Sequence, residues 1–128
     1  MKRRIQTAGA PAAVGPYSQG IASGDLLFCA GQVGLDPLTG DLVAGGVAAE
    51  TERALRNLSA VLDAAGCTYA DVLKTTCFLA DIADFAVFNE VYAGFFPDPP
   101  PARSTFAVAA LPKGARVEVE AIASLAAV

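Results

Sequence analysis

The long amphipathic segment 47–65, flanked on both sides by strand-like segments, is the feature that most constrains the fold. Its apolar residues recur at helical spacing and share one face: Val47, Ala54, Leu55, Leu58, Val61 and Leu62. Its charged residues fall mainly on the other face: Glu50, Glu52, Arg53, Arg56 and Asp63. Gly66 then ends the helix, as a residue that tolerates left-handed backbone should. Such a helix must bury its apolar face against another layer.

The remaining segments have the alternation and turn residues of a sheet with one further helix. A strand pair is predicted at 18–22 and 26–33, followed by a loop over 34–46 with turn signals at Asp36-Pro37 and Thr39-Gly40. A second helix is expected from residue 82 or 84 to 96, ended by Pro97 and the prolines that follow. Further strands are predicted at 71–80, 103–108 and 116–125.

The predicted order β-β-α-β-α-β-β indicates one α+β domain over residues 1–128, with two helices on one face of a mixed sheet. The other face of the sheet then needs a partner. Composition agrees, because 54% of the residues are apolar and only 17% are charged, against a usual charged share of about 25%. We therefore expect a homo-oligomer.

Charge and composition exclude several classes of protein. The net charge is −4, and the basic residues are scattered apart from Lys2-Arg3-Arg4, so nucleic-acid binding is not expected. No apolar run approaches the roughly 20 residues that span a bilayer. Gln6, Gly9, Pro11 and Gly15 interrupt the segment after the basic start, which argues against a secretory signal.

The three cysteines, Cys29, Cys67 and Cys77, are odd in number and lack CxxC spacing. The chain has no histidine, so a zinc site and a Cys–His nucleophile pair both lack their components. Reduced cysteines that serve as small core residues in a cytoplasmic protein are expected.

An arginine in a strand-like segment, followed by two glutamates on the next strand, is the best candidate for chemistry. Alternation places Arg103 and Thr105 on one face of their strand, and Glu118 and Glu120 together on one face of the last strand. A guanidinium can hold a carboxylate through two parallel hydrogen bonds. Taken alone, Arg103 could equally form a structural ion pair, and both glutamates could simply face solvent.

Three other segments are weaker candidates. Tyr17 offers a hydroxyl at the mouth of the first strand, and the glycines of Gly31-Gln32-Val33-Gly34 allow a ligand to approach the backbone. This glycine pair is not a phosphate loop. By itself, Asn89-Glu90-Val91-Tyr92 indicates only the surface or cap of a helix.

Seven short motifs occur in an order and at spacings that resemble the RidA/YjgF/YER057c/UK114 family of reactive-intermediate deaminases. No single motif is specific, but the ordered set covers essentially the whole chain. They are Gly15-Pro16-Tyr17-Ser18-Gln19, Gly31-Gln32, Lys74-Thr75-Thr76, Phe88-Asn89-Glu90-Val91-Tyr92, Pro101-Ala102-Arg103-Ser104, Leu111-Pro112 and Glu118-Val119-Glu120-Ala121.

This resemblance implies a chorismate-mutase-like α+β fold, a homotrimer with sites between subunits, and cofactor-independent hydrolysis of 2-imino acids released by pyridoxal-phosphate enzymes. It further implies that Arg103 binds the substrate carboxylate and that Glu118, rather than Glu120, positions water. The other pocket positions are Tyr17, Gly31, Asn89 and Thr105. The family often has cysteine where this chain has Thr105, and the proline-rich loop 96–101 is expected to reshape the pocket rim.

Other functions share this fold. A non-catalytic ligand-binding or chaperone-like protein would keep the cleft without turnover, although the presence of Arg103 favours the enzyme. An endoribonuclease is disfavoured by the acidic balance. Chorismate mutase shares only the architecture, which does not establish function.

Overall fold

The computed structural model describes residues 1–125, which form one six-stranded sheet and two α-helices. Three short 3₁₀ helices lie at Tyr69–Asp71, Ile82–Asp84 and Pro112–Gly114. The helices are α1 (Gly46–Ala64) and α2 (Phe85–Ala93), and the strands are β1 (Lys2–Ile5), β2 (Gly20–Ser23), β3 (Leu26–Val33), β4 (Val72–Leu79), β5 (Ala102–Ala107) and β6 (Val117–Ser124). All predicted helices and strands are present, within a few residues of their predicted bounds.

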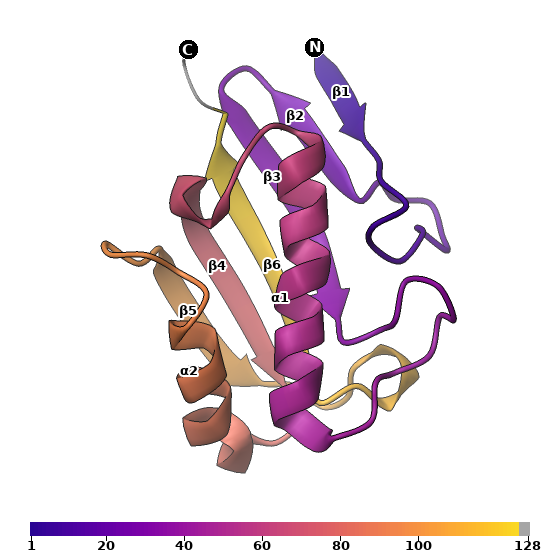
Figure 1. Ribbon diagram of the computed structural model, residues 1–128, viewed down its shortest axis with the longest axis vertical. Coiled ribbons are helices and arrows are strands. Elements are labelled where there is room, and N and C mark those ends of the chain that lie inside the picture. Colours follow the sequence, from indigo (N-terminus) through magenta and orange to yellow (C-terminus); the bar gives the residue numbers. More distant parts are fainter. Residues whose placement is uncertain (126–128) are drawn as a thin grey trace.

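The strands are ordered β1-β2-β3-β6-β4-β5. The β4–β5 pair is parallel and the other pairs are antiparallel, so the sheet is mixed as predicted. Both helices lie on the same face of this sheet (Figure 1). The α+β prediction is therefore confirmed, and neither helix covers the opposite face, which is called the open face below.

Strand β1 was not predicted. Its sequence, Lys-Arg-Arg-Ile, has three exposed residues before the buried Ile5 and so lacks an apolar alternation. It pairs only with β2, at the edge of the sheet. Charged side chains on an edge strand discourage further strand pairing, which accounts for a strand without the usual hydrophobic signal.

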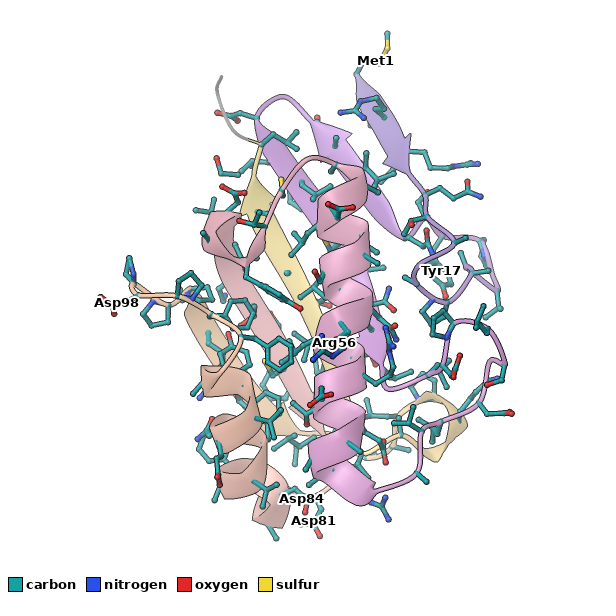
Figure 2. The ribbon with its side chains drawn as sticks, in the orientation of Figure 1. Met1, Tyr17, Arg56, Asp81, Asp84 and Asp98 are labelled. Atoms are coloured by element: carbon teal, nitrogen blue, oxygen red, sulfur yellow. The ribbon has the colours of Figure 1, made fainter. Side chains whose placement is uncertain are left out.

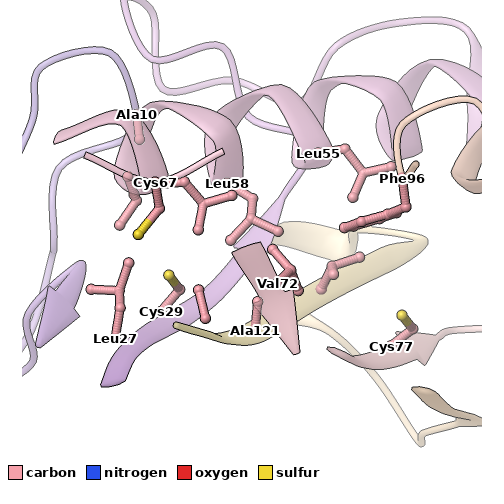
Figure 3. Packing of buried hydrophobic residues seen from close by; sticks show 14 of the residues in the cluster. Ala10, Leu27, Cys29, Leu55, Leu58, Cys67, Val72, Cys77, Phe96 and Ala121 are labelled. Atoms are coloured by element: carbon pink, nitrogen blue, oxygen red, sulfur yellow. The ribbon is translucent and has the colours of Figure 1, made fainter. Parts of the chain in front are cut away.

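The core lies between α1, α2 and the covered face of the sheet. Figure 3 shows this layer, with leucines of α1 facing aliphatic side chains of the strands. All three cysteines are buried and free, as predicted. Burial raises the pKa of the Cys29 thiol to about 12, so this thiol is inert at neutral pH. No helix within residues 1–125 is both long and apolar enough to cross a membrane.

Glu50 departs from the predicted helix pattern, because it is buried rather than exposed on the polar face. Its carboxylate accepts a hydrogen bond from the backbone N–H of Arg116 (2.8 Å) and another from the Arg116 guanidinium (3.1 Å). Asn57 is also buried and donates to the carbonyls of Val33 (3.1 Å) and Leu35 (2.9 Å). These polar contacts tie α1 to the end of β3 and the start of β6.

Helix α2 ends earlier than predicted, at Ala93, with Gly94 as its C-cap. The expected end was Phe96, on the basis of Pro97. Phe96 nevertheless stays buried, packed against the ring of Tyr92 with the ring centroids 4.5 Å apart. The segment after the helix thus turns back across the aromatic face of α2.

We predict that Gly34→Ala strongly destabilises the fold. A Cβ at position 34 would lie 2.7 Å from both the Cα and the carbonyl oxygen of Glu50, and helix backbone is not free to move away. Overpacking of this kind costs about 1–3 kcal/mol. Gly94→Ala is the matched control, since its Cβ would make an ordinary 3.5 Å contact. Urea unfolding should show the loss in the first variant alone; equal stability of the two would contradict this account of α1 packing.

Candidate active site

Arg103 lies on the edge strand β5, with its side chain on the helix-covered face of the sheet. Its guanidinium carbon lies 4.8 Å from the ring centroid of Tyr92 and 5.7 Å from those of Phe85 and Phe88. All three rings belong to α2, at helical spacings of three and four residues. Such cation–π contacts contribute roughly 0.5–2 kcal/mol each, depending on desolvation.

The structural ion pair considered for Arg103 is not formed. Within residues 1–125 the ion pairs are Arg56–Glu52 and Arg116–Glu50. The Arg103 side chain also donates no hydrogen bond to any group in this described part of the chain. A half-buried guanidinium with unpaired donors is costly unless an anion completes it. The site therefore has the properties of an anion receptor.

Asn89 lines a groove together with Arg103, and Thr105 lies two residues after Arg103 on the same face of β5. Asn89 Oδ1 and Thr105 Oγ1 are buried side-chain atoms without a hydrogen bond inside residues 1–125. Asn89, Arg103 and the loop residues Asp98, Pro100 and Pro101 line a groove of about 620 Å³. Figure 2 labels Asp98 at the outer end of this loop. The expected contribution of the proline-rich loop to the pocket rim is thus consistent with its position.

The second predicted catalytic residue, Glu118, lies on the other face of the sheet. Its neighbours Val117 and Val119 are buried in the core, so alternation turns Glu118 away from the helices. Its carboxylate lies directly against Gly31 of β3, since a Cβ at position 31 would overlap Glu118 Oε2. Gly31 is therefore required for this carboxylate position, and the two predicted site residues are together.

Glu118 has a raised pKa. Partial burial removes water from the carboxylate and raises its pKa, and the negative charge of Glu120 on the same face raises it further. Glu120 itself is exposed. A carboxylate with a raised pKa is a better proton acceptor than an ordinary glutamate, which suits a group that activates water.

Tyr17 lies in the loop before β2. Its side chain is exposed, and the residue lines a pocket of about 320 Å³ together with Gly31. The loop is held by Gln19, which is buried; its amide accepts from Thr7 N–H and donates to the carbonyls of Thr7, Ala10 and Pro11. Tyr17 thus belongs to the Gly31 side of the sheet rather than to the Arg103 side.

The predicted site residues therefore form two groups. Asn89 lies on α2, and Arg103 and Thr105 lie on the face of β5 that α2 covers, whereas Gly31 and Glu118 lie together on β3 and β6 and Tyr17 lines a pocket with Gly31. In Figure 2, Tyr17 and Asp98 appear at opposite sides of the molecule. Strands β5 and β6 are separated by β4, which puts them roughly 10 Å apart. Because the two side chains also leave opposite faces, one small molecule does not contact both Arg103 and Glu118 of one chain.

Tyr92 belongs to the apolar set that the sequence predicts for the second helix, although the segment 89–92 by itself indicates only a surface or cap. It is buried, and its ring is the one nearest to the Arg103 guanidinium. The spacing of Phe85, Phe88 and Tyr92 was the available signal, but it indicated only an apolar face. What it could not show is that β5 brings Arg103 against that face.

No cluster of three or more His, Cys, Asp or Glu side chains suited to a metal ion occurs within the described residues. The candidate chemistry of residues 1–125 thus consists of one guanidinium, one carboxylate of raised pKa, and neutral polar groups.

Comparison with known proteins shows the family of this chain. The family model described as Endoribonuclease L-PSP matches residues 7–125. A human protein named 2-iminobutanoate/2-iminopropanoate deaminase is 50% identical over 96% of this chain and 90% of its own length. The chain belongs to this family, here called RidA/YjgF.

Solved structures of the RidA/YjgF family share the whole fold. RidA from an Antarctic Psychrobacter species has a TM-score of 0.92 and 45% identity, covering 95% of this chain and 98% of its own. TdcF of E. coli, solved with bound serine, has a TM-score of 0.92 and 41% identity, covering 97% and 99%. The fold and family implied by the sequence motifs are therefore confirmed, whereas the individual site residues stay predictions.

We predict that Glu120→Gln lowers the pKa of the Glu118 carboxyl group. The substitution removes a like charge while leaving the burial of Glu118 unchanged, so the ionised form becomes easier to reach. A pH titration of Glu118 followed by NMR measures the shift. Glu52→Gln, on the exposed surface of α1, is the control and should leave this titration unchanged. A raised or unaltered value in Glu120→Gln would contradict the arrangement.

Proposed function

We propose that this protein is a cofactor-independent deaminase that hydrolyses 2-imino acids, such as 2-iminopropanoate and 2-iminobutanoate, to 2-oxo acids and ammonia. The observation that carries the proposal is Arg103, a half-buried guanidinium whose donors have no partner in residues 1–125. It fits the carboxylate that every 2-imino acid carries. The name of the human relative points to the same chemistry.

In the proposed mechanism Arg103 binds the substrate carboxylate through two N–H groups and so places the iminium carbon. Glu118 accepts a proton from a water molecule as the water oxygen bonds to that carbon. Glu118 then gives this proton to the nitrogen of the resulting carbinolamine. As the C–N bond breaks, the carbinolamine hydroxyl passes its proton back to the Glu118 carboxylate, so the carbonyl of the 2-oxo acid forms and ammonia leaves. An iminium carbon is already electrophilic, so positioning and proton transfer suffice.

We propose that the complete site lies between two subunits of a homotrimer. The separation of Arg103 from Glu118 in one chain supports this, because a second copy can bring its own Glu118 group to the Arg103 groove. The open face also presents apolar side chains: Phe28 and Phe106 are about 44–45% exposed, and Phe78 packs edge-on against Phe106. Such a face favours burial against a copy of itself.

Two alternative functions would give different results in an assay of imine hydrolysis. A non-catalytic binding protein would bind 2-oxo acids without accelerating imine hydrolysis. The family description Endoribonuclease L-PSP names RNA cleavage, but the net charge of −4 and the scattered basic residues weigh against RNA as the main substrate. We also propose a cytoplasmic location, supported by three buried cysteines that are all free.

A coupled assay tests the activity. A pyridoxal-phosphate-dependent threonine dehydratase releases the imine, and this protein should increase the rate of 2-oxobutanoate formation above the spontaneous rate. Arg103→Ala should reduce kcat/KM by about 100-fold or more, since it removes the charged bidentate contact. Arg56→Ala, which removes an exposed helix ion pair, is the control. No acceleration by the wild-type protein would refute the deaminase proposal.

The two glutamates should differ sharply in the same assay. Glu118→Gln cannot accept a proton from water, and loss of such a group costs about 10²–10⁴-fold in rate. Glu120→Gln should cost far less, because Glu120 is exposed and does not lie against Gly31. The reverse order would show that the water-positioning role belongs to Glu120.

The oligomer is tested by light scattering, where a trimer of the 13.0 kDa chain is expected. Phe106→Glu should weaken it, because the substitution puts a charge into the open apolar face. If the site is shared, mixing inactive Arg103→Ala and Glu118→Gln proteins under exchange conditions should restore part of the activity. A monomer with full activity would contradict the shared site.

A further inference from the structure

The aromatic side chains around Arg103 are arranged to hold its charge without using its donors. Phe85, Phe88 and Tyr92 occupy one face of α2, and the Arg103 guanidinium lies against that face. The ring of Tyr92 is the nearest, with its centroid 4.8 Å from the guanidinium carbon. Rings attract a cation through their faces, whereas the N–H donors of arginine point outward in the guanidinium plane.

An acidic partner would act differently. A carboxylate that held Arg103 by an ion pair would occupy the same N–H fork that has to bind a substrate carboxylate. Within residues 1–125, no carboxylate does so. An anion receptor needs a cation that is held in place while its N–H groups stay free. Aromatic faces meet both needs, because they orient the half-buried guanidinium without binding its N–H groups.

Tyr92 is itself held in place by Thr75. The Tyr92 hydroxyl lies 2.7 Å from Thr75 Oγ1, and both residues are buried. Thr75 is the register partner of Arg103 in the parallel β4–β5 pair, so the strand beside Arg103 also anchors the ring that contacts it. The Cys77 thiol donates to Thr75 Oγ1 at 3.8 Å and adds to this buried hydroxyl cluster.

We infer that Tyr92, oriented by Thr75, is a positioning residue for the Arg103 carboxylate receptor. Neither side chain needs to touch the substrate. Their effect is to fix the direction of the guanidinium fork, and we expect the larger consequence in the affinity for the carboxylate rather than in the rate of water attack. This inference rests on the proposed role of Arg103, but it is tested by ligand binding as well as by turnover.

The main test compares Tyr92→Leu with Tyr69→Leu. Tyr69 is a matched control from the same aromatic cluster: its hydroxyl donates to the Leu55 carbonyl at 2.7 Å, and its ring packs edge-on against Phe95 and Phe96. Calorimetry would measure the dissociation constants of 2-oxobutanoate and of its neutral amide. Tyr92→Leu should weaken 2-oxobutanoate binding about tenfold, equivalent to about 1.4 kcal/mol, while binding of the amide changes little.

A second test measures steady-state kinetics of variants that remove one hydroxyl and keep the shape of the side chain. Tyr92→Phe and Thr75→Val each remove the buried hydrogen bond and should raise KM about threefold, with kcat nearly unchanged. If Thr75 acts through Tyr92, the double variant should raise KM no more than the larger single effect. These conservative variants keep the inference testable if Tyr92→Leu does not fold.

The outcomes separate this inference from the proposed function. The inference would be overturned if Tyr92→Leu and Tyr69→Leu changed the ratio of the two dissociation constants, for 2-oxobutanoate and for its amide, by the same factor. An unchanged KM in both Tyr92→Phe and Thr75→Val would also overturn it. A wild-type protein that binds 2-oxobutanoate without catalysing imine hydrolysis would refute only the deaminase proposal. A wild-type protein that binds no 2-oxobutanoate would overturn both.

Discussion

The alternation of side chains along the central strand β6 is the constraint on which the rest of this structure depends. β6 pairs with β3 on one side and β4 on the other, so neither its position nor its register can change without breaking two strand pairs. Val117 and Val119 enter the core beneath the helices, and Glu118 must therefore face the open side. The core of the protein thereby fixes the face on which its candidate catalytic carboxylate lies.

The same sheet separates the two candidate catalytic residues, Arg103 and Glu118. Arg103, on the edge strand β5, faces α2, and Glu118, on β6, faces away from both helices. In a single copy, the proposed carboxylate receptor and the proposed water-activating group therefore lie at different places. This separation is the geometric reason for the proposed site between subunits, in which a second copy brings its Glu118 to the Arg103 groove.

The surroundings of Arg103 illustrate how a protein can hold a cation in place while its N–H donors stay free for a ligand. Arg103 has rings rather than a carboxylate beside it, and the nearest ring is anchored through Thr75 on the neighbouring strand. The cost of partial desolvation is offset by the ring faces, while the N–H groups stay available. Buried Glu50 shows the opposite arrangement, because both of its oxygens are already bound to Arg116 and its role is structural.

The sequence by itself determined the fold class, the family and all the elements except β1 and the 3₁₀ helices. Periodicity located both helices and the inner strands, alternation placed Glu118 opposite Val117, and the ordered motifs identified the family. It did not locate β1, whose basic residues lack apolar alternation, or the burial of Glu50. Only the tertiary structure decided that Arg103 meets Tyr92 and not Glu118. Local patterns determine which way a side chain leaves its own strand, whereas the contacts it makes depend on strand order and helix packing, which join residues far apart in the chain.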